Sequence, residues 1–336
     1  MADPKYSERG KAGQRGGLWI TFINFFLFLA KFFASILTRS LSVRADAINN
    51  LSDAGTGLIT YFGFRLSSKP ADKEHPFGHA RGESIASLVM AVLVLILGFE
   101  VGKSSVLSIW AGKKTVISPV ALWVLGGSIA VKLGLFVFCR RMGKRLSSTL
   151  LHAAAIDSLS DVAASSAIFV AGIFSPMVNL PLDGIMGLVV AGFILFTGFS
   201  LIRNTASNLL GEAPKTELYN KILEIVSAYD GVLDAHDLVI HSYGSNRKFA
   251  TLHIEVAADH PLWQSHEMAD KIERDMRERL NIEMVIHLDP VQTDDEEVIA
   301  LRERIQEMLA MLDPAISMHD FWAVKQTSGT KLLFDV

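Results

Sequence analysis

Six apolar runs, each close to the length of a membrane-spanning helix, constrain this chain of 336 residues more than any other feature. A helix needs about 20 mostly apolar residues to cross a bilayer. We place the spans near Leu18–Leu37, Ser42–Phe64, Ser84–Ile109, Pro119–Phe138, Leu150–Phe174 and Leu182–Ile202. The second and fifth are the weakest, because polar residues interrupt them at regular spacing. We therefore expect an α-helical membrane protein with six transmembrane helices.

The composition divides the chain into a membrane part and a water-soluble part. Half of the residues are hydrophobic, which is too many for an ordinary soluble protein and too few for a chain that lies in lipid throughout. The single cysteine, Cys139, excludes an intrachain disulfide framework and a thiolate metal cluster. The expected parts are an N-terminal segment over 1–16, a transmembrane domain over 17–210, an α/β domain over 212–292 and a further unit over 293–336.

Basic residues indicate the orientation in the membrane. They gather before the first span, after the second and after the fourth, whereas the alternate connections hold few. Because lysine and arginine are enriched in cytoplasmic loops, both termini and the domain after residue 212 are expected in the cytoplasm. The three basic groups are Lys5, Arg9, Lys11 and Arg15; Arg65, Lys69, Lys73 and Arg81; and Arg140, Arg141, Lys144 and Arg145.

Polar side chains at matched spacing interrupt the second and fifth spans. In "DAINNLSDAG" Asn49 and Asp53 are four residues apart, as are Asp157 and Asp161 in "AIDSLSDVAA". Residues four apart share one helix face, so the two helices can face one another and surround one cation. The alternative is a pair of polar faces satisfied by serines and water. That alternative leaves three carboxylates uncompensated in a low-dielectric interior, so a bound divalent cation is the simpler explanation.

Other polar residues of the spans have less defined roles. Asp46 lies two turns before Asp53 and could guide cations at one mouth of a pathway, or cap or pair near the interface. Asn50 points away from Asn49 and is expected to pack between helices. We interpret Lys31 and Lys132 as snorkelling or pairing inside the bundle rather than as metal ligands.

With these motifs the chain resembles the cation diffusion facilitators, a family of divalent-metal/proton antiporters. The resemblance rests on the six spans, on "ADAINNLSD" and "PADKEHPFGHARGES", and on "AHDL" and "IHLDP" further along. In zinc-transporting members, the site typically has His or Asp plus Asp on the second helix, and His plus Asp on the fifth. Asn49 and Asp157 stand at two of those positions here, a pattern similar to the manganese branch.

Coordination chemistry supports the same metal. Zinc favours imidazole and thiolate, whereas an all-oxygen site suits manganese, magnesium or calcium. Magnesium sheds its water reluctantly and calcium requires more ligands. The residues alone therefore predict a hard divalent cation, and the resemblance narrows this to Mn²⁺, whose export by alternating access we expect. The alternatives are an exporter of Zn²⁺, Fe²⁺ or Cd²⁺ with relaxed selectivity, and a membrane-anchored metal sensor. No nucleophile–base set, P-loop or nucleotide fingerprint is present, so an enzyme is not expected.

Protons are the expected counter-ion. Three like charges in a poorly solvated pocket should hold at least one proton near neutral pH until a metal binds. The protons then belong to the three aspartates as a group, because Asn49 cannot titrate.

The connection after the second span carries a second candidate metal site. Asp72, His75 and His79 have the spacing of a small site, and the resemblance assigns a secondary metal to these positions. A charged turn held by Pro76 and Gly78 would explain the same residues without a metal.

Residues 215–291 read as helix, strand, strand, helix and strand. The resemblance implies that this is a ferredoxin-like, metallochaperone-like domain that forms a homodimer and binds regulatory divalent metal between subunits. The positions implied are His236, His253, His266, His287 and Asp289. The expected setting is the bacterial plasma membrane, with lipid but no nucleic acid as a partner.

Residues 293–336 resemble a second, incomplete copy of the helix–strand–strand unit. Both copies contain "HD" followed by an apolar residue, and His319 matches His236. The second copy stops at Val336, where the first continues into another helix and strand, so either the copy is incomplete by nature or the chain was cut. An unfinished unit leaves a strand edge that needs a partner.

Overall fold

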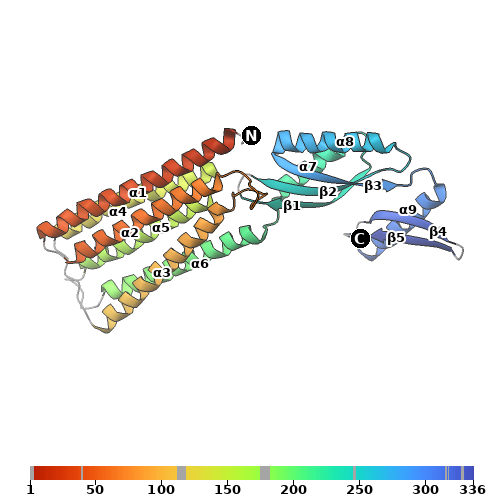
Figure 1. The fold of residues 1–336 in the computed structure, drawn as a ribbon. Coiled ribbons are helices and arrows are strands. Elements are labelled where there is room, and N and C mark those ends of the chain that lie inside the picture. The colour runs from red at the N-terminus through yellow and green to blue at the C-terminus, as the bar shows by residue number, and fades with distance from the viewer. Residues whose placement is uncertain are drawn as a thin grey trace. The chain divides into compact units, whose positions relative to one another are not determined.

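The computed structural model describes residues 4–38, 41–111, 119–174, 182–244, 247–314, 316, 318–326 and 329–336. They form two compact units, drawn as ribbons in Figure 1. The first contains the residues up to Gly211 together with Tyr243 and Gly244, and the second contains the others.

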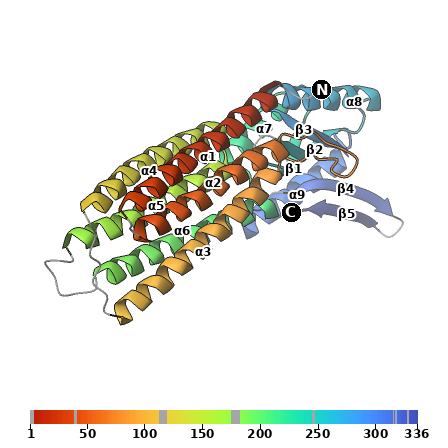
Figure 2. The ribbon, with the colours of Figure 1, turned by 60° about the vertical axis from the view of Figure 1, so that its left-hand side comes forward.

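The described residues of the first unit form a bundle of six long helices. These helices run side by side (Figure 2). Their bounds are α1 Pro4–Thr38, α2 Leu41–Ser67, α3 Gly82–Trp110, α4 Pro119–Leu146, α5 Thr149–Phe174 and α6 Leu182–Leu210. Within the described residues, five of these helices are long and apolar enough to cross a membrane, and α2 is not among them. Its 27 residues are long enough at about 1.5 Å per residue, but the predicted polar positions lower its hydropathy.

The first helix begins earlier than its apolar run. Polar residues from Lys5 to Gly16, expected ahead of the first span, continue the helix of α1. Arg9 is one example of how these polar residues pack. Its Nη2 atom forms an ion pair with the Glu83 Oε2 atom at the start of α3, at a distance of 2.9 Å. Both side chains are largely buried, so this ion pair ties α1 to α3 at one end of the bundle.

Two glycines allow α1 and α2 to pack closely. A Cβ atom added to Gly17 would lie 2.5 Å from the Tyr61 backbone nitrogen, and one added to Gly57 would lie 2.5 Å from the Thr21 nitrogen. Such distances leave no room for a side chain. Small residues at helix contacts let backbones approach, which is a common way to associate helices in lipid.

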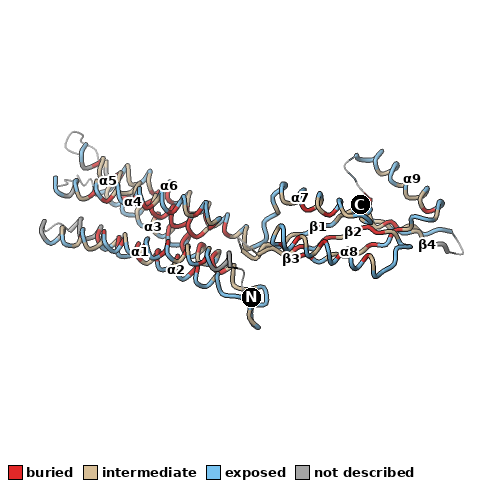
Figure 3. The backbone as a smooth tube through the Cα atoms, turned by 90° about the horizontal axis from the view of Figure 1, so that it is seen from above, coloured by how far each residue is buried: buried red, intermediate tan, exposed pale blue. Residues whose placement is uncertain are grey.

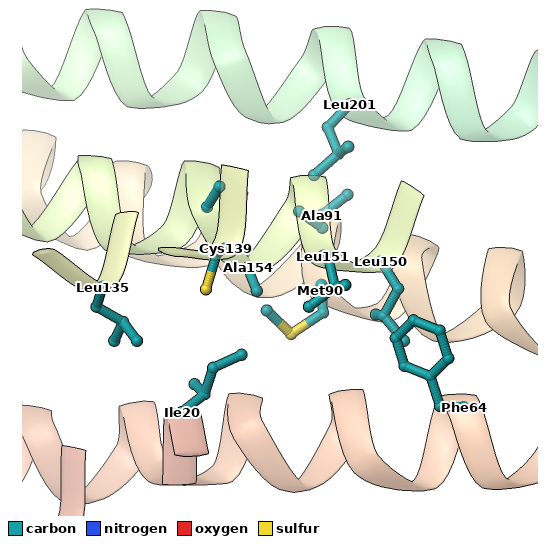
Figure 4. Packing of buried hydrophobic residues seen from close by; sticks show 12 residues of the cluster. Ile20, Phe64, Met90, Ala91, Leu135, Cys139, Leu150, Leu151, Ala154 and Leu201 are labelled. Atoms are coloured by element: carbon teal, nitrogen blue, oxygen red, sulfur yellow. The ribbon is translucent and has the colours of Figure 1, made fainter. Parts of the chain in front are cut away.

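The interior of the bundle is apolar toward one end. Figure 4 shows Ile20 and Phe64 on one side of the cluster and Leu201 on the other, with Met90, Leu150 and other residues between them. Figure 3 shows buried residues between the helices and exposed ones along the outer faces. Large apolar side chains lie on those outer faces, including Phe22, Phe196 and Phe199. This is the pattern expected of helices that contact lipid.

The second unit begins with a three-stranded sheet and two helices. The elements are α7 Thr216–Ser227, β1 Asp234–Ser242, β2 Lys248–Ala257, α8 Leu262–Asp275 with a π-helical turn over Met276–Leu280, and β3 Ile282–Val291. Strand β2 is central, antiparallel to β1 and parallel to β3. The order αββαβ is the predicted one. Ile222, Leu252 and Ile272 are fully buried between the sheet and its helices.

The second unit ends with a helix and a two-stranded sheet. These are α9 Glu296–Leu312, β4 His319–Gln326 and β5 Gly329–Asp335, with β4 and β5 antiparallel. Asp295 caps α9, since its Oδ1 atom accepts from the Glu297 and Val298 backbone nitrogens. Val298, Met318 and Phe321 form a small apolar core of their own.

Candidate metal sites

The membrane cluster joins α2 and α5. Asp53 comes from α2, and Asp157 and Asp161 come from successive turns of α5. Each offers a carboxylate oxygen within 4.8 Å of the others, and all three side chains are buried. The structure thus brings together the three carboxylates for which the spacing predicted facing helices. Three such groups in a dry interior attract a cation strongly.

A lysine from a third helix reaches this cluster. The Lys132 Nζ atom on α4 lies 2.7 Å from the Asp53 Oδ2 atom and 2.6 Å from the Asp161 Oδ2 atom. Its side chain is only 5% exposed. The sequence indicated a lysine paired inside the bundle but gave no reason to connect it with these aspartates. Its ammonium group stands where a cation between Asp53 and Asp161 would stand.

Polar neighbours fix the backbone of the cluster. The Asp53 carbonyl accepts a hydrogen bond of 2.7 Å from the Thr56 hydroxyl and a longer one, 3.4 Å, from the Asn24 amide of α1. Asn24 was not among the predicted residues, although an asparagine within an apolar span was the available signal. Asn49 is partly exposed on α2, whereas Asn50 is buried, as expected for a residue between helices. Asp46 belongs to α2, but its side chain lies outside the described residues.

The connection between α2 and α3 brings its three predicted residues together. The Asp72 carboxylate lies 3.6 Å from the His75 Nδ1 atom and 3.7 Å from the His79 Nε2 atom. The Lys69 ammonium, 2.8 Å away, and the His75 backbone N–H donate hydrogen bonds to Asp72 and hold the pKa of that carboxyl well below its usual range. The carboxylate is therefore ionised and available to a cation, although Lys69 competes for it.

Strand register aligns the histidines of the second unit. His236 on β1 is paired with His253 on β2, and His253 is paired with His287 on β3. Asp289, two residues after His287, points to the same face, because side chains alternate along a strand. Its Oδ2 atom lies 3.0 Å from the His253 Nδ1 atom and 3.5 Å from the His236 Nε2 atom. Three of the five predicted residues thus converge.

Of the other two predicted residues, one lies beside this group and one lies apart from it. His287 is exposed, with its Nε2 atom 3.2 Å from the Asp289 Oδ1 atom, so it shares Asp289 with His253. His266 is exposed on α8 and belongs to no metal-ligating group of the described residues. In place of His266, the residue that completes the group around His236 is Asp320 of β4, which sequence reasoning missed. The repeated "HD" motif was the signal that could have found it.

Comparison with known proteins defines the class. A family model described as the cation efflux transmembrane domain matches residues 18–210, and one described as the cytoplasmic domain of cation efflux proteins matches residues 214–291. The first match alone spans more than half of the chain. The chain belongs to the cation efflux, or cation diffusion facilitator, family. It is therefore a multi-pass membrane transporter of metal cations and not an enzyme.

Individual relatives are distant in sequence, but each match covers most of this chain and most of the relative. The manganese efflux system protein MneS of Bacillus subtilis is 29% identical over 296 residues, which are 86% of this chain and 99% of MneS. The cation-efflux pump FieF of Yersinia enterocolitica is 29% identical over 296 residues, 86% of this chain and 95% of that pump. FieF of Pectobacterium carotovorum is 30% identical over 273 residues, 79% of this chain and 88% of its own.

Proposed function

We propose that the protein exports Mn²⁺ from the cytoplasm in exchange for protons, by alternating access to the Asp53–Asp157–Asp161 cluster. The observation that carries this proposal is the donor set: three buried carboxylates from two helices meet in the bundle, without an imidazole or thiol in their group among the described residues. Both termini and the second unit then face the cytoplasm. The name of MneS, a manganese efflux protein, supports the same metal.

The donor set favours manganese over zinc for a physical reason. Affinity for nitrogen ligands rises steeply from Mn²⁺ toward Zn²⁺, so a site without imidazole gives up more zinc affinity than manganese affinity. Asn49, one turn before Asp53 on α2, would add a neutral amide oxygen. In an oxygen-only site, Mn²⁺ can therefore compete with Zn²⁺ for binding.

In the metal-free carrier, Lys132 supplies a positive charge to the carboxylate cluster. Without metal, its ammonium group offsets part of the negative charge of the cluster through Asp53 and Asp161. Mn²⁺ brings two positive charges and must displace the ammonium group or share the carboxylates with it. After the metal leaves, Lys132 and protons restore the less charged cluster. A buried carboxylate group without such compensation would be costly in the return step.

A second candidate is an exporter of Zn²⁺, Fe²⁺ or Cd²⁺ with relaxed selectivity. The two FieF relatives carry the general name of cation-efflux pump, which fits a broader range of cargo. A sensor that moves no ions is less suited to a carboxylate cluster inside the membrane.

The second unit would act as a homodimeric regulatory domain. Its match to the cytoplasmic domain of the family supports this role, with His236, His253 and Asp289 as the core of a metal site. A purified protein that stays monomeric at micromolar concentration with metal present would contradict the dimer.

Metal competition in proteoliposomes tests the choice of cargo. Purified protein is reconstituted, and uptake of Mn²⁺ is measured against equal concentrations of Zn²⁺, Fe²⁺ or Cd²⁺. We expect Mn²⁺ to be transported and to be displaced weakly by the others. Preferential transport of Zn²⁺ or Fe²⁺ would favour the second candidate.

A further inference from the structure

The group around His236 contains a ligand from outside the region that the family models match. Those matches end at residue 291, whereas Asp320 belongs to β4. The His236 Nε2 atom lies 3.5 Å from the Asp289 Oδ2 atom and 3.5 Å from the Asp320 Oδ1 atom. His236, His253, Asp289 and Asp320 each offer a ligand atom within 4.8 Å of the others. Two imidazoles and two carboxylates therefore converge on one point.

The two "HD" motifs have the same backbone shape. Asp237 and Asp320 both adopt left-handed conformations, with φ of 50° and 53°. Each strand shows a register shift at this place, between His236 and Val239 in β1 and between His319 and Trp322 in β4. Left-handed residues other than glycine are uncommon, and bulges often re-aim side chains at functional sites. Both motifs therefore have the same backbone feature, a left-handed aspartate at a register shift of the strand.

The two motifs also face each other. The rings of His236 and His319 stack with centroids 4.3 Å apart, and the His319 Nδ1 atom lies 3.7 Å from the Asp320 Oδ2 atom. An ion pair supports this docking farther along the sheet, where the Arg302 Nη2 atom of α9 lies 2.7 Å from the Oε2 atom of the fully buried Glu255 on β2. The Arg302–Glu255 ion pair and the histidine contacts therefore both hold the α9–β4–β5 unit against the β1–β2–β3 sheet.

Unsatisfied buried atoms indicate that a ligand is needed. Within the described part of the chain, both ring nitrogens of His236 are buried without a hydrogen-bond partner, and its side chain is 10% exposed. The Asp320 Oδ1 atom is also buried without one. Buried polar groups are nearly always paired, and each exception needs an explanation. A cation between the His236 Nε2 atom and the Asp320 Oδ1 atom, which lie 3.5 Å apart, would satisfy both of these atoms together.

We propose that the α9–β4–β5 unit completes a metal site within the same chain, with Asp320 as the fourth ligand beside His236, His253 and Asp289. Two nitrogen and two oxygen donors suit a four-coordinate Zn²⁺ ion and favour it over Mn²⁺. The site would thus bind a metal that differs from the proposed cargo. The metal would fasten the α9–β4–β5 unit to the sheet. This inference rests in part on the proposed cytoplasmic metal site at His236, His253 and Asp289.

Zn²⁺ affinity of the full-length protein tests the fourth ligand. The background carries Asp53→Ala, Asp161→Ala and His79→Ala, so that Zn²⁺ bound in the second unit is measured alone by competition with a chelator. In this background Asp320→Asn removes the charge but keeps a residue that tolerates the left-handed conformation. Asp294→Asn, in the exposed linker before α9, is the matched control. His253→Ala tests the underlying site.

We expect Asp320→Asn to weaken Zn²⁺ binding by at least the ~10–100-fold that loss of even an outer-shell partner costs, with Asp294→Asn unchanged. An unchanged affinity in Asp320→Asn with a loss in His253→Ala would overturn the fourth ligand and leave the cytoplasmic site standing. No loss in either variant would overturn both.

Limited proteolysis is a second measurement, and it distinguishes a lost ligand from a misfolded variant. Zn²⁺ should protect the linker between β3 and α9 from proteolysis in the background protein and in Asp294→Asn, but not in Asp320→Asn. Without metal all three should give the same fragments. Equal protection by Zn²⁺ in Asp320→Asn would count against the proposal.

Discussion

At the residue scale, Asp157 is the position that should set the choice of metal. It stands where zinc-type members of the family would place a histidine, and its carboxylate lies with Asp53 and Asp161 in one buried group. Replacing it by histidine would add a nitrogen donor, which benefits zinc more than manganese.

We therefore expect Asp157→His to raise the ratio of zinc to manganese transport, whereas Asp53→Ala and Asp161→Ala abolish transport of both. Uptake of each metal into proteoliposomes measures the ratio. An unchanged ratio in Asp157→His would mean that the metal is chosen elsewhere, for example at the mouth of the pathway.

Lys132 should matter most when metal is absent. Its ammonium group joins Asp53 and Asp161 at 2.7 and 2.6 Å in the interior. Removing one partner of a buried ion pair costs about 3–5 kcal/mol, because the remaining charge is left uncompensated. We expect Lys132→Met to lower the thermal stability of the metal-free protein and to increase the stabilisation by Mn²⁺.

Thermal unfolding in detergent, with and without Mn²⁺, measures both effects. The control is Lys103→Met, which removes an exposed lysine from α3. If Mn²⁺ stabilised Lys132→Met no more than the wild-type protein, the ammonium group would not compete with metal.

Sequence spacing predicted the three aspartates and could not predict Lys132. The four-residue spacing on two helices fixes which side chains share a face, so only the facing of α2 and α5 remained open. A single lysine in an apolar span has no second polar residue at a defined spacing, so the sequence does not show which neighbouring helix it faces. Its position depends on how α4 is rotated about its axis, which the packing of neighbouring helices decides.

At the element scale, the contact between α1 and α2 depends on Gly57. A Cβ atom there would lie 2.5 Å from the Thr21 backbone nitrogen, while one on Gly55 of the same helix would meet no atom within 4 Å. Forcing atoms into a packed contact costs typically ~1–3 kcal/mol. Because α2 carries Asp53, a displaced α2 would also disturb the metal cluster.

We expect Gly57→Ala to lower thermal stability and transport, and Gly55→Ala to be neutral or slightly stabilising because it restricts the unfolded chain. Unfolding midpoints and Mn²⁺ uptake of the two variants provide the comparison. Equal stability of the two would show that α1 and α2 separate easily at this position.

The order of elements was largely predictable, and the docking of the last unit was not. Apolar length predicted the helices of the bundle, and alternation predicted the αββαβ order of the second unit. The repeat made β4 and β5 recognisable as strands. The repeated "HD" motif could have marked His319 and Asp320 as candidates, but their position against His236 depends on how two folded pieces pack, which a sequence motif does not determine.

At the scale of the whole molecule, the proposed function combines a carboxylate cluster in the helix bundle with a proposed metal site in the second unit. In the proposed function, the cluster would provide the binding step of transport, and protons together with Lys132 would provide the compensating charge for the return step. An inward proton gradient should therefore drive export. A heat of Mn²⁺ binding that did not depend on the ionisation enthalpy of the buffer would indicate no net proton release.

The most direct test is Mn²⁺ uptake into proteoliposomes that are acidic inside. We expect uptake that the pH gradient drives in the wild-type protein and that Asp161→Ala abolishes. The control Asp72→Ala, which changes only the loop site between α2 and α3, should retain uptake. Uptake that persisted in Asp161→Ala, or that continued unchanged without the gradient, would contradict proton-coupled manganese export through the carboxylate cluster.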